Sequence, residues 1–198
     1  MSVVVGGLTK IKVQTAEEGC RAAKLTDPAR ALLTPKATVA EFLAALIEAG
    51  CLRDGVALMA YSMPKREAVW WACLAAHSAV TESTSAAIKA ALEAAEAWVY
   101  QPSEEKRRAA MARAQAAGFD HPAVWAAVGA FWSGGSMAPA DAPIVPPPEH
   151  LTGLAVDGAV GLAAGAGEPA QVPVRLRRYL DQAIDIANGG SGRVGGVN

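Results

Sequence analysis

The sequence predicts an all-α protein. Of its 198 residues, 45 are alanine, which is the best helix-forming residue and a poor strand-forming one. Hydrophobic residues make up 52% of the chain and charged residues 19%, so the chain has enough apolar surface to bury a core. Apolar stripes at helical spacing recur along the chain and are separated by short loops. This pattern is typical of a compact multi-helix bundle or a short HEAT/armadillo-like stack of antiparallel helix pairs.

The N-terminal residues 1–14 are predicted to form an arm or a small β-hairpin. Short apolar and alternating segments flank a Gly6-Gly7 turn, as they do in two paired strands. The helices begin after this segment. A short helix is expected with Asp27 as its N-cap and Pro28 in its first turn, where the missing N–H is harmless.

Six further segments are predicted as helices from their apolar stripes, caps and terminal glycines or prolines. They cover approximately residues 38–50, 54–62, 64–80, 84–100, 103–118 and 121–132.

The composition changes at residues 137–149, which are rich in proline and alanine. This segment is predicted to be an extended, polyproline-like connector. A glycine-containing helix is expected at 151–166 and a last helix at 173–187, followed by a flexible tail at 188–198. The predicted organisation is therefore a single helical domain over residues 15–187.

Charge and cysteine content exclude several classes of protein. Nineteen acidic and 18 basic residues give a net charge of −1, which excludes a nucleic-acid binder that relies on bulk positive charge. Three cysteines without a Cys-x-x-Cys pair favour a reducing compartment. The chain has no pattern of a secretory signal, and no apolar stretch reaches the roughly 20 residues of a membrane span. We therefore expect a cytoplasmic protein without a membrane span.

One pair of residues has the spacing of a reactive site. Cys73 and His77 lie four residues apart, so a helix places them on one face, as a thiolate and its base or two metal ligands require. Because a zinc site needs three or four ligands and this face is mostly apolar, core packing is the favoured interpretation. No catalytic, cofactor or metal site is therefore predicted. The alternative is an enzyme or small-ligand site that uses Glu67, Cys73 and His77.

Residues 103–108 contain a Ser-x-x-Lys spacing that also occurs in some acyl-transfer enzymes. So short a pattern arises easily by chance. Ser103 is interpreted as a helix N-cap, and Lys106, Arg107 and Arg108 as solvated helix surface.

The chain has five tryptophans but only three phenylalanines and three tyrosines. Adjacent helical residues point about 100° apart, so Trp70 and Trp71 do not both face the core. Exposed tryptophans are enriched at binding hot spots. We therefore expect a partner-binding groove with tryptophans on its wall and basic residues on its rim. The residues expected to form it are Lys65, Arg66, Trp71, Trp98 and Trp132.

Three segments carry a resemblance to a known family. They are Pro64-Lys65-Arg66-Glu67-Ala68-Val69-Trp70-Trp71-Ala72-Cys73, then Ala94-Ala95-Glu96-Ala97-Trp98-Val99 leading into Pro102-Ser103-Glu104-Glu105-Lys106-Arg107-Arg108-Ala109-Ala110, and Phe131-Trp132-Ser133-Gly134-Gly135-Ser136. On these motifs the chain resembles the uncharacterised bacterial family DUF6931 over roughly residues 28–187. Such proteins are encoded in Gram-negative bacteria and sometimes lie near type VI secretion genes. No activity, ligand or catalytic residue is established for the family.

The resemblance implies an accessory role on the cytoplasmic side of secretion. The expected function is a non-enzymatic protein-interaction module, an adaptor or chaperone-like factor that holds a secretion effector or spike component. The alternatives are the small-ligand or enzyme site described above and a structural subunit that acts by self-association.

Overall fold

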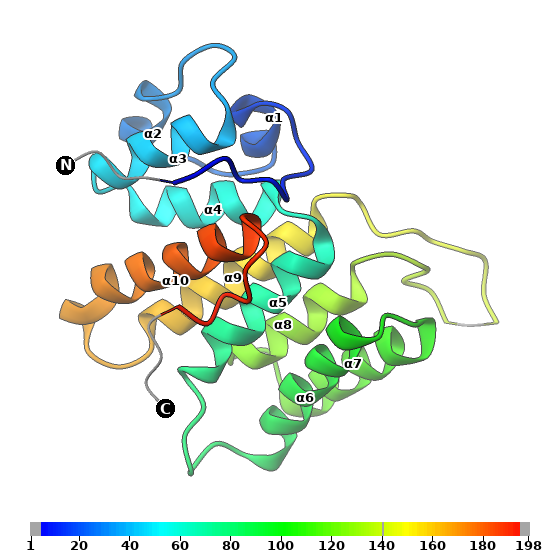
Figure 1. The fold of residues 1–198 in the computed structure, drawn as a ribbon. Helices are drawn as coiled ribbons and strands as arrows, with labels where there is room; N and C mark the ends of the chain where they lie inside the picture. Colours follow the sequence, from blue (N-terminus) through cyan, green and yellow to red (C-terminus); the bar gives the residue numbers. More distant parts are fainter. Residues whose placement is uncertain (1–4, 140, 195–198) are drawn as a thin grey trace. The chain divides into compact units, whose positions relative to one another are not determined.

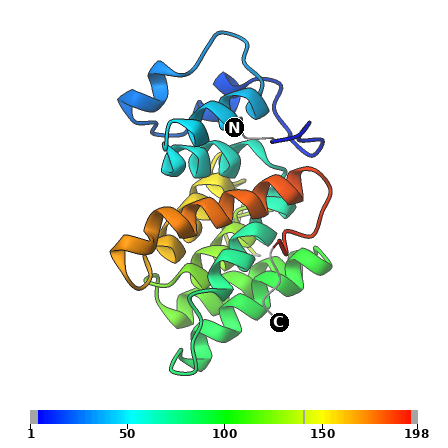
Figure 2. The same ribbon diagram turned by 60° about the vertical axis from the view of Figure 1, so that its left-hand side comes forward.

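The computed structural model describes residues 5–139 and 141–194, and this part of the chain is all-helical, as predicted (Figure 1, Figure 2). It contains ten α-helices, one short 3-10 helix and no β-strand in the described residues. No helix in these ranges is both long and apolar enough to cross a membrane. In chain order the helices are α1 (Ala16–Cys20), α2 (Asp27–Ala31), α3 (Val39–Glu48), α4 (Leu52–Ser62), α5 (Lys65–His77), α6 (Ala86–Tyr100), α7 (Glu104–Ala117), α8 (Pro122–Phe131), α9 (Leu151–Gly165), the 3-10 helix η1 (Pro169–Gln171) and α10 (Val172–Ala187).

The chain divides into two compact units. The first unit comprises Met1–Pro64 and Ala164–Asn198, and the second comprises Lys65–Ala163. The boundary at residue 164 falls inside α9. The single domain over residues 15–187 stays a prediction.

Two helix starts show how the sequence sets the ends of its elements. Ser103 caps α7 as predicted, because its Oγ accepts a hydrogen bond from the Lys106 amide at 3.2 Å. Thr38 and Glu41 form a capping box at α3, in which each side chain accepts from the backbone amide of the other. Both arrangements satisfy amides that have no partner within the helix.

The cap of α2 is Thr26, not the predicted Asp27. Thr26 has extended backbone angles, and its Oγ1 accepts from the Ala29 amide at 3.4 Å. The amide and hydroxyl of Thr26 also donate to the Asp54 carboxylate, at 2.7 and 3.0 Å. Asp54 therefore fixes Thr26 at the helix entrance, and Asp27 becomes the first helical residue.

In the first unit, α4 lies between α1, α3 and α10. Gly55 allows this packing, because a Cβ there would lie 3.3 Å from side-chain atoms of both Leu43 in α3 and Leu180 in α10. The fully buried apolar side chains of α4 are those of Val56, Leu58 and Met59.

The predicted N-terminal hairpin does not form in the described residues 5–14, which contain no strand. The Lys10 amide donates to the last carbonyl of α10 at 2.7 Å, and the Lys12 amide donates to the last carbonyl of α4 at 2.9 Å. The hairpin prediction is wrong here because these amides bond to helix ends instead of to a second strand. Residues 1–4, which hold most of the first predicted strand, lie outside the described residues.

The chain that follows α10 contacts this N-terminal segment. The Asn188 side chain accepts from the Leu8 amide at 3.0 Å and donates to the Val5 carbonyl at 3.1 Å. Asn188, the first residue of the predicted tail, is therefore joined to the N-terminal segment by two hydrogen bonds of its side-chain amide. Residues 195–198 lie outside the described residues.

In the second unit, α8 packs against α5, α6 and α7. Gly129 permits a close approach on one side of α8. A Cβ at this position would lie 3.4 Å from the Val69 side chain and 3.6 Å from that of Ala155. This unit contains all five tryptophans of the chain.

Candidate functional site

The hypothetical pocket of Glu67, Cys73 and His77 lacks a reactive thiol. Cys73 is completely buried. Its burial raises the pKa of the thiol well above the ordinary value, and the nearby Glu96 carboxylate raises it further. His77 lies on the surface, where its Nε2 is 2.7 Å from Glu96 Oε1. A thiol held protonated is a poor nucleophile, so the structure favours core packing for Cys73.

The described ranges also contain no cluster of three or more His, Cys, Asp or Glu side chains that would hold a metal ion.

Two of the three tryptophans expected at a groove are buried. Trp71 has no exposed surface and Trp98 is 6% exposed, whereas Trp132 is half-buried. The assignment of Trp71 to an exposed face is therefore wrong. The phase of α5 turns Trp71 into the core and leaves its neighbour Trp70 at the surface.

The two basic residues expected on the rim have structural contacts. Lys65 Nζ lies 2.9 Å from Glu149 Oε2. Arg66 Nε donates to the Val99 carbonyl at 2.6 Å, and its terminal nitrogen donates to the Tyr100 carbonyl at 3.4 Å. These carbonyls lie at the C-terminal end of α6, where helix carbonyls lack partners and a cation is favourable. Lys65 and Arg66 therefore have contacts within the second unit, and their place on the rim of a groove stays a prediction.

The aromatic side chains at the surface form two groups. Trp70 and Tyr100 have ring centroids 5.9 Å apart, and Tyr100 is 65% exposed. Trp125 packs edge-on against both Phe119 and Trp132, at 6.3 and 6.4 Å. Of the predicted groove tryptophans, only Trp132 takes part in such a surface group.

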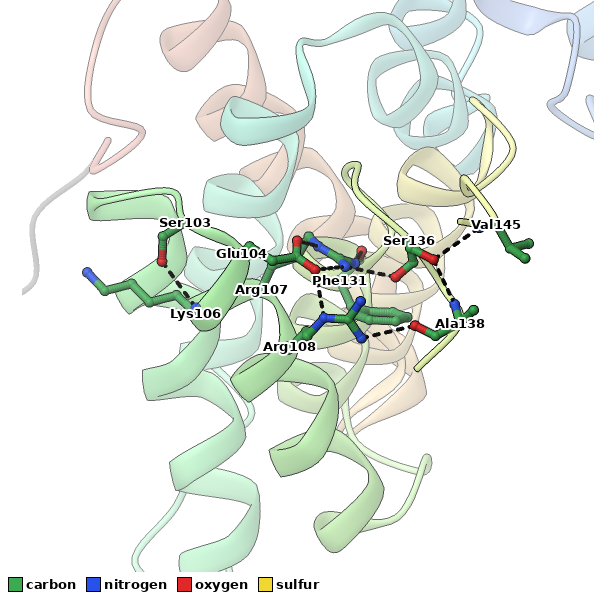
Figure 3. Close-up of polar contacts among 9 residues, drawn as sticks. All are labelled: Ser103, Glu104, Lys106, Arg107, Arg108, Phe131, Ser136, Ala138 and Val145. Carbon is green, nitrogen blue, oxygen red and sulfur yellow. Dashed lines mark hydrogen bonds and ion pairs between the residues drawn. The ribbon is translucent and has the colours of Figure 1, made fainter. Parts of the chain in front are cut away.

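A polar site in the second unit surrounds the buried side chain of Arg107 (Figure 3). Two of its nitrogens donate to the Glu104 carboxylate, at 2.7 and 2.8 Å. It also donates to the carbonyls of Phe131, at 2.6 Å, and Ser136, at 2.8 Å. Its guanidinium carbon lies 4.5 Å from the centroid of the Phe131 ring. Arg107 therefore joins α7 to the end of α8 and to the segment after it.

The Glu104 carboxylate accepts hydrogen bonds from two arginines, Arg107 and Arg108. Besides its bidentate contact with Arg107, it accepts from Arg108 Nε at 2.7 Å. The hydrogen bond from Arg107, followed by the bond from Arg108 and both positive charges, lowers the pKa of Glu104 from 4.5 to about 2. The carboxylate therefore stays ionised wherever the protein is near neutral pH.

The described residues between α8 and α9, 132–139 and 141–149, are held against α7 rather than extending freely; we call them the anchored loop. Ser136 Oγ accepts from the amides of Ala138 and Val145, at 3.1 and 3.0 Å. The Met137 amide donates to the Val145 carbonyl at 2.7 Å, which closes the base of the loop. Arg108 adds a bond to the Ala138 carbonyl at 3.0 Å.

The anchored loop presents apolar side chains to solvent. Ile144 is 80% exposed and Val145 is 46% exposed. Beside the base of the loop is a cleft of about 470 Å³. Its walls are formed by Arg108, Met111, Ala112, Gln115, Phe131, Met137, Ala138 and Pro139. Exposed apolar side chains on the anchored loop therefore lie beside a partly apolar cleft.

A family model covers these elements. The model is described as "Family of unknown function (DUF6931)" and matches residues 42–187. The chain belongs to this family. Neither the curated proteins nor the solved structures gave a match to the chain.

The three segments that carry the resemblance to DUF6931 contact one another through two arginines. Arg66 in the first segment bonds to Val99 in the second. Arg107 in the second segment bonds to Phe131 and Ser136 in the third. These motifs therefore form one connected framework, and the anchored loop begins at its end.

The burial of Arg107 was missed by sequence reasoning, which assigned it to solvated helix surface. Its position within a basic run gives no local sign of burial. A partial signal was present in the Glu104 to Arg107 spacing, which places the two side chains one helical turn apart. The partners after α8 are 24 and 29 residues away in sequence, so helical spacing alone does not reveal them.

Proposed function

We propose that this DUF6931 protein is a non-enzymatic protein-interaction module that binds its partner through the anchored loop. The observation that carries the proposal is the 80% exposure of Ile144 on a loop fixed by the bonds of Arg107 and Ser136. An ordered loop loses less conformational entropy on binding than a mobile one does. An exposed apolar side chain beside a cleft supplies surface that a partner can bury.

The proposal moves the contact face from the expected tryptophan groove to the anchored loop. It keeps the role of a cytoplasmic adaptor or chaperone-like factor of type VI secretion, with an effector or spike component as the partner. The secretion role is supported by the family resemblance alone, whereas the binding role is supported by the loop geometry.

The test is affinity purification of the tagged full-length protein from its host, with quantitative mass spectrometry. The variant Ile144→Asp places a charge on the loop without disturbing a buried residue. The matched control is Val174→Asp, because Val174 is also an exposed apolar residue, 62% exposed, but lies in α10. We expect Ile144→Asp to reduce recovery of the specific partner at least about tenfold, and Val174→Asp to retain it.

Equal recovery of the partner with the wild-type protein, Ile144→Asp and Val174→Asp would show that the anchored loop is not the contact face. Loss of a partner unrelated to secretion would support the binding role and contradict the secretion role.

A further inference from the structure

The backbone of residues 142–148 is constrained to be extended by its own sequence. Proline fixes φ near −65° and pushes the residue before it into the extended or polyproline II region. The prolines at 143, 146, 147 and 148 apply one or both constraints to every position of this segment except Ile144. Residues 143–148 of the described structure lie in neither a helix nor a strand, so no helix or sheet hydrogen bonding opposes these constraints.

The middle and the C-terminal end of this segment are bonded to the second unit. Both backbone groups of Val145 are bonded, its amide to Ser136 and its carbonyl to Met137. At the C-terminal end, Glu149 pairs with Lys65, and the Pro148 carbonyl accepts from the first amide of α9 at 3.1 Å. The position of this segment is therefore fixed by contacts within the second unit before any partner binds.

The exposed side chains have the arrangement that polyproline recognition requires. A polyproline II helix has three residues per turn, so in that conformation Pro143 and Pro146 share one ridge, about 9 Å apart. Both rings are exposed, and Ile144 beside them is the most exposed large apolar side chain in the described residues. Figure 3 shows the Val145 side chain pointing away from Ser136, and Val145 is 46% exposed.

We propose that residues 143–148 are a preformed polyproline II ligand for a partner domain with an aromatic-lined groove. This proposal rests on the proposed function and names the kind of partner. Aromatic grooves accept Pro-x-x-Pro segments because the proline rings pack between flat aromatic side chains and the helix loses little entropy on binding. Residues 143–146 of this chain, Pro-Ile-Val-Pro, have this spacing.

The test uses the full-length protein in its host with a photo-crosslinking residue at position 141, next to the ligand segment. Two synthetic peptides serve as competitors in the lysate. One has the sequence of residues 141–150, and the other is identical except for Pro143→Ala and Pro146→Ala. We expect the first peptide at saturating concentration to reduce the crosslinked product at least about tenfold and the second less than about twofold. The crosslinked partner segment is expected to contain tryptophan or tyrosine.

The other outcomes separate this proposal from the proposed function. A crosslink that neither peptide reduces, in a protein whose partner is lost on Ile144→Asp, retains the interaction but overturns polyproline recognition. Equal competition by both peptides also overturns it, because Ile144 and Val145 alone would then account for binding. Absence of any crosslinked product, together with normal recovery by Ile144→Asp, overturns both proposals.

Discussion

The side chain of Arg107 donates to a set of acceptors that no other type of side chain can satisfy together. Its planar guanidinium holds one carboxylate through two nitrogens and donates to two backbone carbonyls at once. A lysine has three donors on a single atom and does not reproduce this planar fork. The charge is tolerated inside the second unit because Glu104 neutralises it and the four hydrogen bonds of the guanidinium are only 2.6–2.8 Å long.

The substitution Arg107→Met should destabilise the protein by about 3 kcal/mol, because it removes a buried partner from a carboxylate and two carbonyls. The measurement is denaturant unfolding followed by tryptophan fluorescence. Arg108→Met is the control, since the Arg108 side chain is 31% exposed and exposed ion pairs contribute less than about 1 kcal/mol. Equal losses in the two variants would show that the burial of Arg107 is not what makes it stabilising.

Acid should weaken the protein partly through Glu104. Its pKa is lowered in the folded state from 4.5 to about 2, so its contribution is complete above pH 4.5 and is lost as the pH falls through 2. Glu104→Gln should therefore show a smaller fall in the free energy of unfolding between pH 5 and pH 2, measured by denaturant titration at each pH.

Glu105→Gln is the matched control for this prediction, because it removes the same charge from the next, exposed position. Glu41 also contributes to the acid dependence, since its hydrogen bonds with Thr38 lower its pKa. The variant Glu104→Gln should therefore reduce, but not abolish, the dependence of the free energy of unfolding on pH. An unchanged pH dependence in Glu104→Gln would contradict the proposal that the ion pairs of Glu104 with Arg107 and Arg108 contribute to acid sensitivity.

The tryptophans show the limit of helical phase as a predictor. The phase correctly indicates that Trp70 and Trp71 point in different directions, but it does not decide which of them is buried. That choice depends on where α6 and α8 pack against α5, which is tertiary information. For the same reason, the burial of Trp98 was not apparent from its own helix.

The helices and the loops between them differ in how far sequence determines them. Long helices such as α6 and α7 have a clear end and, in addition, an apolar stripe or a capping serine. Their existence was therefore predicted correctly. The five-residue α1 was missed because so short an element has no repeating stripe. Residues 137–149 are predicted to be an extended connector, and that conformation stays a prediction, whereas the fixed position of the anchored loop depends on bonds from α7 that no local pattern shows.

The anchored loop gives a prediction that compares two adjacent glycines. Gly135 has φ +63°, and a Cβ there would lie 2.7 Å from Glu104 Oε2 and 2.8 Å from Arg107 Nε. Gly134 has no atom within 4 Å of the same position and no positive φ. Gly135→Ala should therefore destabilise the protein by about 1–2 kcal/mol, because it adds backbone strain and displaces the bonded pair.

Gly134→Ala should be neutral or stabilising by up to about 1 kcal/mol, because it only reduces the entropy of the unfolded chain. Thermal unfolding of the two variants side by side is the measurement. Hydrogen exchange at the Val145 amide should also increase in Gly135→Ala alone, since that amide bonds to the segment displaced by the new side chain. Similar behaviour of the two variants would contradict the proposed packing of the loop onto Arg107.

The division of the chain into two units can be tested with its natural fluorophores. All five tryptophans belong to the second unit, so their fluorescence reports on that unit alone. Circular dichroism in the far ultraviolet reports on the helices of both units. The boundary at residue 164 falls within the continuous helix α9, so loss of this helix removes structure assigned to each unit.

The single domain predicted over residues 15–187 requires that a change in the first unit also affect the second. Asp54 is 6% exposed and accepts two bonds from Thr26, so Asp54→Ala should destabilise the first unit by about 2 kcal/mol. If the chain unfolds as one cooperative domain, as α9 leads us to expect, the denaturation midpoints from fluorescence and circular dichroism should fall together in this variant. A fluorescence midpoint that stays at its wild-type value while the dichroism transition splits into two would establish two independently folding domains and contradict the prediction.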